Sequence, residues 1–123
     1  MENLISYLQA ESQKWPGVKT SYRKSWECEY FEVIDKFFCM IGETKTGDVV
    51  MTVKGDPEKN EELREQYHFI VPGYYTNKTH WNSIMLAQST FGKEELLAYL
   101  RRSYELVFAK LPEKVQKSLL ESS

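Results

Sequence analysis

Three apolar runs lie close together in the middle of the chain, separated only by short clusters of turn-forming residues. They cover residues 28–34, 37–43 and 49–54 and are rich in aromatic and branched side chains, which strands favour. The gaps between them, Asp35-Lys36 and Thr44 to Asp48, are too short for the crossover that parallel strands need. The sequence therefore predicts an antiparallel meander of three strands.

Helical patterns flank this meander. One helix is expected over residues 3–14, ending before Pro16-Gly17, and a second is expected from the capping pair Asp56-Pro57 to residue 67. A long helix is expected to start near Lys93, because apolar residues then recur at spacings of three and four: Leu97, Leu100, Tyr104, Val107, Phe108 and Leu111. Pro112 ends this run, and a short terminal helix is expected over residues 113–120.

Two further short strands are expected over residues 69–71 and 83–87, and residues 18–26 are expected to be irregular. The predicted order is therefore α-β-β-β-α-β-β-α, with about five strands. A chain of 123 residues suits one domain, and we expect residues 1–123 to form it.

No apolar run approaches the roughly 20 residues that a membrane helix needs. The first residues carry no basic segment followed by an apolar stretch, as a signal peptide would. We therefore expect a monomer in the cytoplasm with no membrane partner. Cys28 and Cys39 are expected to be buried thiols, since a zinc set with His68 and His80 lacks the usual close ligand spacing. No metal and no cofactor are expected.

Catalytic motifs are absent from the sequence. It contains no Gly-x-Ser-x-Gly elbow and no phosphate-binding loop, because Gly92-Lys93 lacks the upstream glycine. We therefore expect no enzyme. An enzyme would require a pocket in which Asn77, His80 and an acid converge.

The segment from Tyr74 to Trp81 is the first candidate binding surface. Lys78 has the charge to contact phosphate, and Asn77 and His80 have hydrogen-bonding groups for a backbone or a base edge. Tyr74, Tyr75 and Trp81 suit stacking on bases or peptide side chains, but aromatics that lead into a strand also fill cores. Both interpretations of the three rings stay open.

The second candidate is the basic side of the last helices, formed by Arg101, Arg102, Lys110, Lys114 and Lys117. Residues 70–123 hold seven basic and five acidic side chains, although the whole chain has a net charge of -2. The alternative is that these cations form a solvent-exposed helix face with no binding role. The overall negative charge predicts that any contact with nucleic acid is weak and sensitive to salt.

Two blocks of the sequence resemble the MmcQ/YjbR family of small bacterial proteins. The first runs from Pro72-Gly73 to His80-Trp81-Asn82, and the second runs from Ser103-Tyr104 to Leu111-Pro112. A weaker third block is Lys54-Gly55-Asp56-Pro57-Glu58, where the family often has cysteine in place of Gly55. Together they span about residues 15–115.

The resemblance implies an α+β fold, a two-layer α/β sandwich with helices on one side of an antiparallel sheet, as in bacterial secretion chaperones. It also implies DNA binding through a double-wing arrangement. Carried over by position, the family pattern nominates Asn77, Lys78, His80, Trp81 and Lys110 as contact residues. Because secretion chaperones bind proteins, the alternative is a protein- or peptide-interaction module that binds no nucleic acid.

Overall fold

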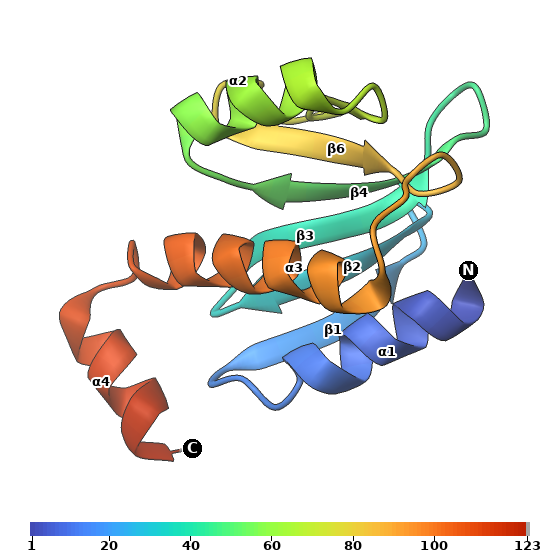
Figure 1. Ribbon diagram of the computed structural model, residues 1–123. Helices are drawn as coiled ribbons and strands as arrows, with labels where there is room; N and C mark the ends of the chain where they lie inside the picture. The colour runs from blue at the N-terminus through green and yellow to red at the C-terminus, as the bar shows by residue number, and fades with distance from the viewer. Residues whose placement is uncertain (123) are drawn as a thin grey trace.

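Six strands form one antiparallel sheet in the computed structural model, which describes residues 1–122 (Figure 1). They are β1 (Val18–Arg23), β2 (Cys28–Val33), β3 (Lys36–Glu43), β4 (Val49–Lys54), β5 (Ile70–Pro72) and β6 (Trp81–Met85). The spatial order is β1-β2-β3-β4-β6-β5, and every neighbouring pair is antiparallel. The predicted meander is therefore confirmed as β2-β3-β4.

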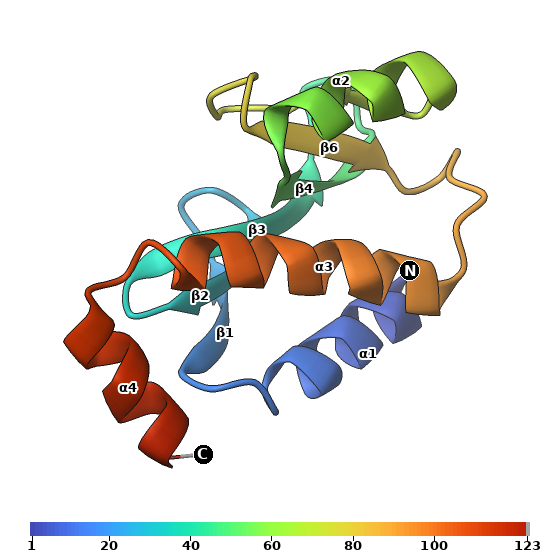
Figure 2. The same cartoon turned by 60° about the vertical axis from the view of Figure 1, so that its left-hand side comes forward.

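The four helices within residues 1–122 are α1 (Glu2–Ser12), α2 (Pro57–Gln66), α3 (Lys93–Phe108) and α4 (Glu113–Ser122). In both views α1, α2 and α3 lie against the same face of the sheet, and α4 lies beyond the C-terminal end of α3 (Figures 1 and 2). This arrangement confirms the predicted α+β class with helices on one side.

Strand β1 corrects the expectation of irregular structure for residues 18–23, whereas residues 24–26 do lie in a turn. It lies at the edge of the sheet and pairs only with β2. None of its side chains is fully buried, and polar residues occupy most of its positions. An edge strand of this kind lacks the apolar alternation by which strands are detected in a sequence. The sheet therefore has one strand more than expected.

The turn between β2 and β3 begins one residue earlier than the sequence suggests. Val33 faces Lys36 across the ladder, so Ile34 and Asp35 form a two-residue turn. Their φ angles of 46° and 63° lie in the left-handed region that type I′ hairpin turns require. A branched residue is strained in that conformation, and the Ile34 side chain is exposed.

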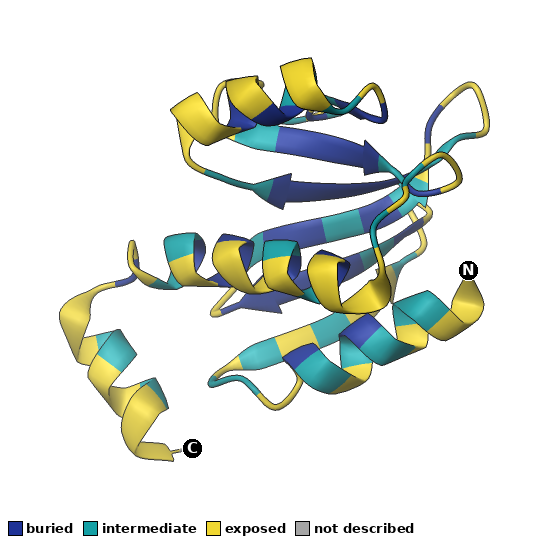
Figure 3. Cartoon of the chain, in the orientation of Figure 1, coloured by how far each residue is buried: buried dark blue, intermediate teal, exposed yellow. Residues whose placement is uncertain are grey.

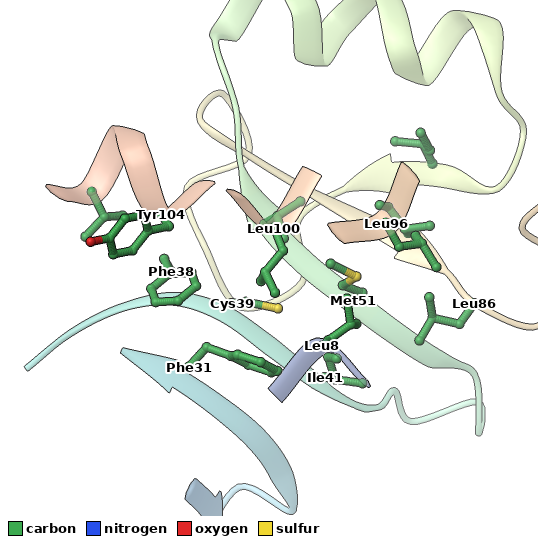
Figure 4. Close-up of a cluster of buried hydrophobic side chains, with 14 of the residues drawn as sticks. Leu8, Phe31, Phe38, Cys39, Ile41, Met51, Leu86, Leu96, Leu100 and Tyr104 are labelled. Atoms are coloured by element: carbon green, nitrogen blue, oxygen red, sulfur yellow. The ribbon is translucent and has the colours of Figure 1, made fainter. Parts of the chain in front are cut away.

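The hydrophobic core fills the space between the sheet and helices α1 and α3 (Figure 4). Fully buried side chains come from α1, from three central strands and from α3: Leu8, Phe31, Phe38, Cys39, Ile41, Met51 and Leu100. Leu96, Leu100, Tyr104 and Val107 form the buried stripe of α3, much as its apolar spacing predicts. The outward faces of the helices are exposed, whereas the central strands are largely buried (Figure 3).

The other face of the sheet carries no helix within residues 1–122 (Figures 1 and 2). Because side chains alternate along a strand, the register places Tyr30, Met40, Thr52 and Ser83 side by side on this face. We call it the open face. Two loops border it, one between β1 and β2 and the other between β5 and β6.

Candidate nucleic-acid interface

The loop between β5 and β6 contains the first candidate segment and is held by its own backbone. The Asn77 side-chain oxygen accepts hydrogen bonds from the backbone N–H groups of Thr79 and His80, at 2.9 and 3.2 Å. The N–H of Trp81 donates to the carbonyl of Asn77 at 3.0 Å. The Asn77 side chain therefore shapes the turn, as asparagine often does.

Lys78 braces the same loop from its other end. Its ammonium donates to the backbone carbonyl of Gly73 at 2.8 Å, and the Arg64 guanidinium donates to the carbonyl of Lys78 at 3.1 Å. An ammonium has three donors, so this bond leaves two of them for another partner. The Lys78 and His80 side chains are both exposed.

A buried amide pair joins this loop to α2, and our sequence analysis did not identify it. Asn60 donates to the carbonyls of Gly55 and Thr79, both at 3.2 Å. Asn82 donates to the carbonyl of Asn60 at 3.1 Å and accepts from Arg64 at 2.8 Å. Asn60 and Asn82 are each 3% exposed. Only the position of Asn82 at the end of the first family block hinted at this network.

The three aromatic residues of the segment have different environments. Trp81 is half-buried and stacks on Phe37, with ring centroids 4.6 Å apart and ring planes 21° apart. Tyr74 is half-buried, and its backbone N–H donates to the Ser83 hydroxyl at 3.0 Å. Tyr75 is 75% exposed. Trp81 therefore has a packing role, whereas Tyr75 is available for contact.

The two adjacent arginines of α3 are both ion-paired. Arg101 binds Glu105 at 3.2 Å, and its guanidinium lies over the rings of Trp15 and Tyr104. Arg102 binds Asp56 at 3.2 Å, on the side of α3 that faces α2. The expected capping role of Asp56 is therefore wrong for its side chain, which makes no capping hydrogen bond to α2. Arg102 also lies 3.7 Å from the carboxylate of Glu105, so both guanidinium groups share that carboxylate, and only Arg102 reaches Asp56.

Two lysines lie near the ends of β4 and α3, and their charges influence each other. Burial lowers the pKa of the Lys54 ammonium, and the positive charge of Lys110 lowers that pKa further. The backbone N–H of Lys54 donates to the Ser103 hydroxyl at 2.8 Å, which fixes the end of β4 against α3. Among residues 1–122, no ion pair joins a carboxylate to Lys54 or to Lys110.

The loop and the helix end lie at the same end of the sheet (Figures 1 and 2). The N–H of Gly55, next to Lys54, donates to the carbonyl of His80 at 3.0 Å. Lys114 follows in the first turn of α4, whose Gln116 side chain donates to the carbonyls of Ala109 and Leu111. We call this region the cationic end and define it by Lys54, Lys78, His80, Arg102, Lys110 and Lys114.

The cysteines do not form the zinc set that the sequence analysis considered. Both are buried free thiols, and the strand register places Cys28 and Cys39 on opposite faces of the sheet. Residues 1–122 contain no cluster of three His, Cys, Asp or Glu side chains arranged to hold a metal ion. No helix within that range is long and apolar enough to span a bilayer.

Known proteins with similar sequences and structures support the family resemblance. The chain is 27% identical to the Escherichia coli K12 protein YjbR over 121 residues, which cover 98% of each chain. It is 33% identical over 92 residues to YbdF of Escherichia coli O157:H7, which covers 74% of this chain and 73% of YbdF.

Two crystal structures have the same fold. The Deinococcus radiodurans protein DR2400, a DUF419 domain, superposes with a TM-score of 0.80 at 30% identity, covering 94% of this chain and 86% of that chain. A Pseudomonas syringae protein superposes with a TM-score of 0.68 at 22% identity, covering 85% of this chain and 96% of that chain. The YjbR family model matches residues 13–106. The chain therefore belongs to the YjbR family.

Proposed function

We propose that this protein binds DNA through the cationic end, by weak contacts to backbone phosphates that do not depend on base sequence. The observation that carries the proposal is that Lys54 and Lys110, which lie near the ends of β4 and α3 on one side of the molecule, both lack a paired carboxylate within residues 1–122. Burial lowers the pKa of the Lys54 ammonium, and repulsion by the positive charge of Lys110 lowers that pKa further. A phosphate bound beside both lysines would relieve that repulsion.

Neighbouring groups extend this pair along the end of the sheet. Lys114 is exposed at the start of α4, and Lys78 is exposed in the loop beside β6. The hydrogen bond from Gly55 to His80 supports a continuous surface from the end of β4 to this loop. These lysines are the cations that the proposal assigns to the phosphates of a short stretch of duplex.

The other charges of the chain limit how tightly it can bind DNA. Arg102 is engaged by Asp56, and the chain as a whole has a net charge of -2. If four phosphates are neutralised, log affinity falls against log salt with a slope of about -3.6. We therefore expect dissociation constants in the roughly micromolar range or weaker at physiological salt.

The test is a fluorescence anisotropy titration of a labelled duplex of about 20 base pairs at low salt. Lys54→Gln and Lys110→Gln should each weaken binding and reduce the steepness of the salt slope by about 0.9. Lys45→Gln is the matched control, because Lys45 is exposed in the turn at the opposite end of β4. Absence of binding at low salt, or equal losses from all three variants, would contradict the proposal.

A further inference from the structure

A groove of about 620 Å³ crosses the open face of the sheet, away from the helices. Its floor includes Met40, Val50 and Thr52, from the central strands β3 and β4. One rim is the β1–β2 loop, with Trp26 and Glu27, and the other is the β5–β6 loop, with Tyr74 and Tyr75. We call this feature the open-face groove.

Aromatic rings line the groove and continue beyond it. Trp26 lies 5.8 Å from Tyr30, and Tyr30 lies 5.8 Å from Phe37, measured between ring centroids. Phe37 then stacks on Trp81. Tyr30 is 7% exposed and supports its neighbours from below, so a partner can reach Trp26 and the half-buried Phe37.

The largest exposed rings lie on the two rims. Trp26 is 61% exposed and Tyr75 is 75% exposed. Large aromatic side chains left in water around a concave apolar floor are typical of contact sites. Both rings line the groove, Trp26 from the β1–β2 loop and Tyr75 from the β5–β6 loop.

Backbone strain supports a role for both rims. Glu27 has a φ of 49° and Tyr75 a φ of 60°, both in the left-handed region. Glycine or asparagine adopts that region more readily than either residue. Strained residues tend to cluster at functional sites, and here each rim has one strained residue whose side chain lines the groove.

The charges around the groove suit a cation better than a phosphate. Glu27 and Glu43 line it and are exposed, and neither is in an ion pair within residues 1–122. Lys45 is the one lysine or arginine among the lining residues. Arg23 already places its guanidinium 4.1 Å from the ring centroid of Tyr30 while it binds Glu32. Aromatic faces beside free carboxylates are a suitable environment for a guanidinium or ammonium group.

We propose that the open-face groove binds an extended peptide segment that carries large apolar side chains together with basic ones. Apolar side chains of the segment pack between the rims on Met40 and Val50, and its basic side chains reach Glu27 and Glu43. This activity is separate from the proposed DNA contact, since the groove lies on the open face and presents carboxylates.

The proposal is tested with two fluorescein-labelled peptides, GSLRFRLSG and its acidic counterpart GSLEFELSG, titrated with the full chain. The basic peptide should bind at least about tenfold more tightly than the acidic one, a difference typical of one well-placed charge contact. Equal affinities, or no binding of the basic peptide at about 1 mM protein, would overturn the proposal.

Substitutions in the chain then test whether the groove is the peptide-binding site. Tyr75→Ala should weaken binding of the basic peptide about tenfold, whereas Tyr22→Ala should leave it unchanged. Tyr22 is the matched control because it is 57% exposed on β1 and does not line the groove. The double change Glu27→Gln with Glu43→Gln should abolish the preference for the basic peptide. If it leaves the preference intact, the groove is not the site.

The same preparation separates this proposal from the proposed DNA binding. Lys110→Gln should leave peptide affinity unchanged, and Tyr75→Ala should leave duplex affinity unchanged. Loss of peptide binding in Lys110→Gln would place the peptide at the cationic end and contradict the groove assignment. If the chain binds the basic peptide but not the duplex, the DNA proposal fails and the groove proposal stands.

Discussion

The aromatic ring of Phe37 stacks on the indole of Trp81 and thereby ties the start of β3 to the start of β6, two strands that are not neighbours in the sheet. This contact spans the end of β4 and holds the β5–β6 loop beside Lys54. The position of the β5–β6 loop therefore depends on the packing of these two rings on the open face.

The first prediction concerns this stacked pair. Trp81→Ala should lower the free energy of unfolding by about 2 kcal/mol, roughly half the loss for a fully buried tryptophan, because Trp81 is half-buried. Tyr75→Ala, in the same loop, should change it by less than about 0.5 kcal/mol, since Tyr75 is mostly exposed. Urea denaturation measures both. Equal large losses would mean that the whole loop is structural.

The second prediction uses the strained turn between β2 and β3. Ile34→Asn should raise the free energy of unfolding by about 1 kcal/mol, because asparagine tolerates the left-handed backbone that Ile34 adopts. The comparison variant Ile34→Val keeps the branched side chain and should not stabilise the protein. A loss of stability in Ile34→Asn would show that the exposed isoleucine makes contacts that outweigh its strain.

The third prediction concerns pH. Burial raises the pKa of the Cys39 thiol well above its ordinary value of 9.0. A thiol whose pKa is higher in the folded state than in the unfolded state favours folding below the unfolded pKa, and this contribution is lost as pH rises. Stability should therefore fall as pH rises above about 9.

Urea denaturation between pH 8 and roughly 9.5 tests the thiol before most tyrosines ionise. Cys39→Val removes the more strongly shifted of the two thiols and should make the decline shallower, while Cys28, whose pKa burial also raises, keeps a smaller share of it. Tyr30, Tyr99 and Tyr104, whose pKa values burial raises, should produce a further fall at higher pH in both proteins. An unchanged decline in Cys39→Val would mean that Cys39 is not responsible.

Helices and strands can be predicted from the sequence where burial imposes a regular spacing of apolar residues. The strand from Val49 to Lys54 was predicted with its observed bounds, because it lies centrally and its residues 50–53 are all buried. Strand β1 was missed because it buries one side only weakly at the edge of the sheet. Turn placement near Ile34 was off by one residue, since a branched residue does not suggest a left-handed turn.

Only part of the candidate sites could be predicted from the sequence. The segment from Tyr74 to Trp81 stood out as a local cluster, and its place beside β4 and α3 follows from long-range pairing that no local pattern contains. The open-face groove brings Trp26, Met40 and Tyr75 together from three distant parts of the chain. Trp26 lies in a turn far from Tyr75 in sequence, and no local pattern relates the two residues.

The pairing of the arginines shows a second limit of sequence analysis. Spacing along α3 placed Arg101 and Arg102 together outside the apolar stripe, and both are exposed. It did not reveal that Asp56, which is distant in sequence, pairs with Arg102, or that Arg101 lies over Trp15. Conversely, no local pattern in the sequence links Lys54 to Lys110, whose charge lowers the pKa of Lys54 in the folded chain.

The most direct test of DNA binding at the cationic end is the salt dependence of duplex affinity for the unmodified protein and the double variant Lys54→Gln with Lys110→Gln. The unmodified protein should show a slope near about -3.6 in log affinity against log salt, and the double variant a slope near about -1.8 with weaker binding throughout. Identical slopes and affinities for the two proteins, or no binding by the unmodified protein at low salt, would contradict the account.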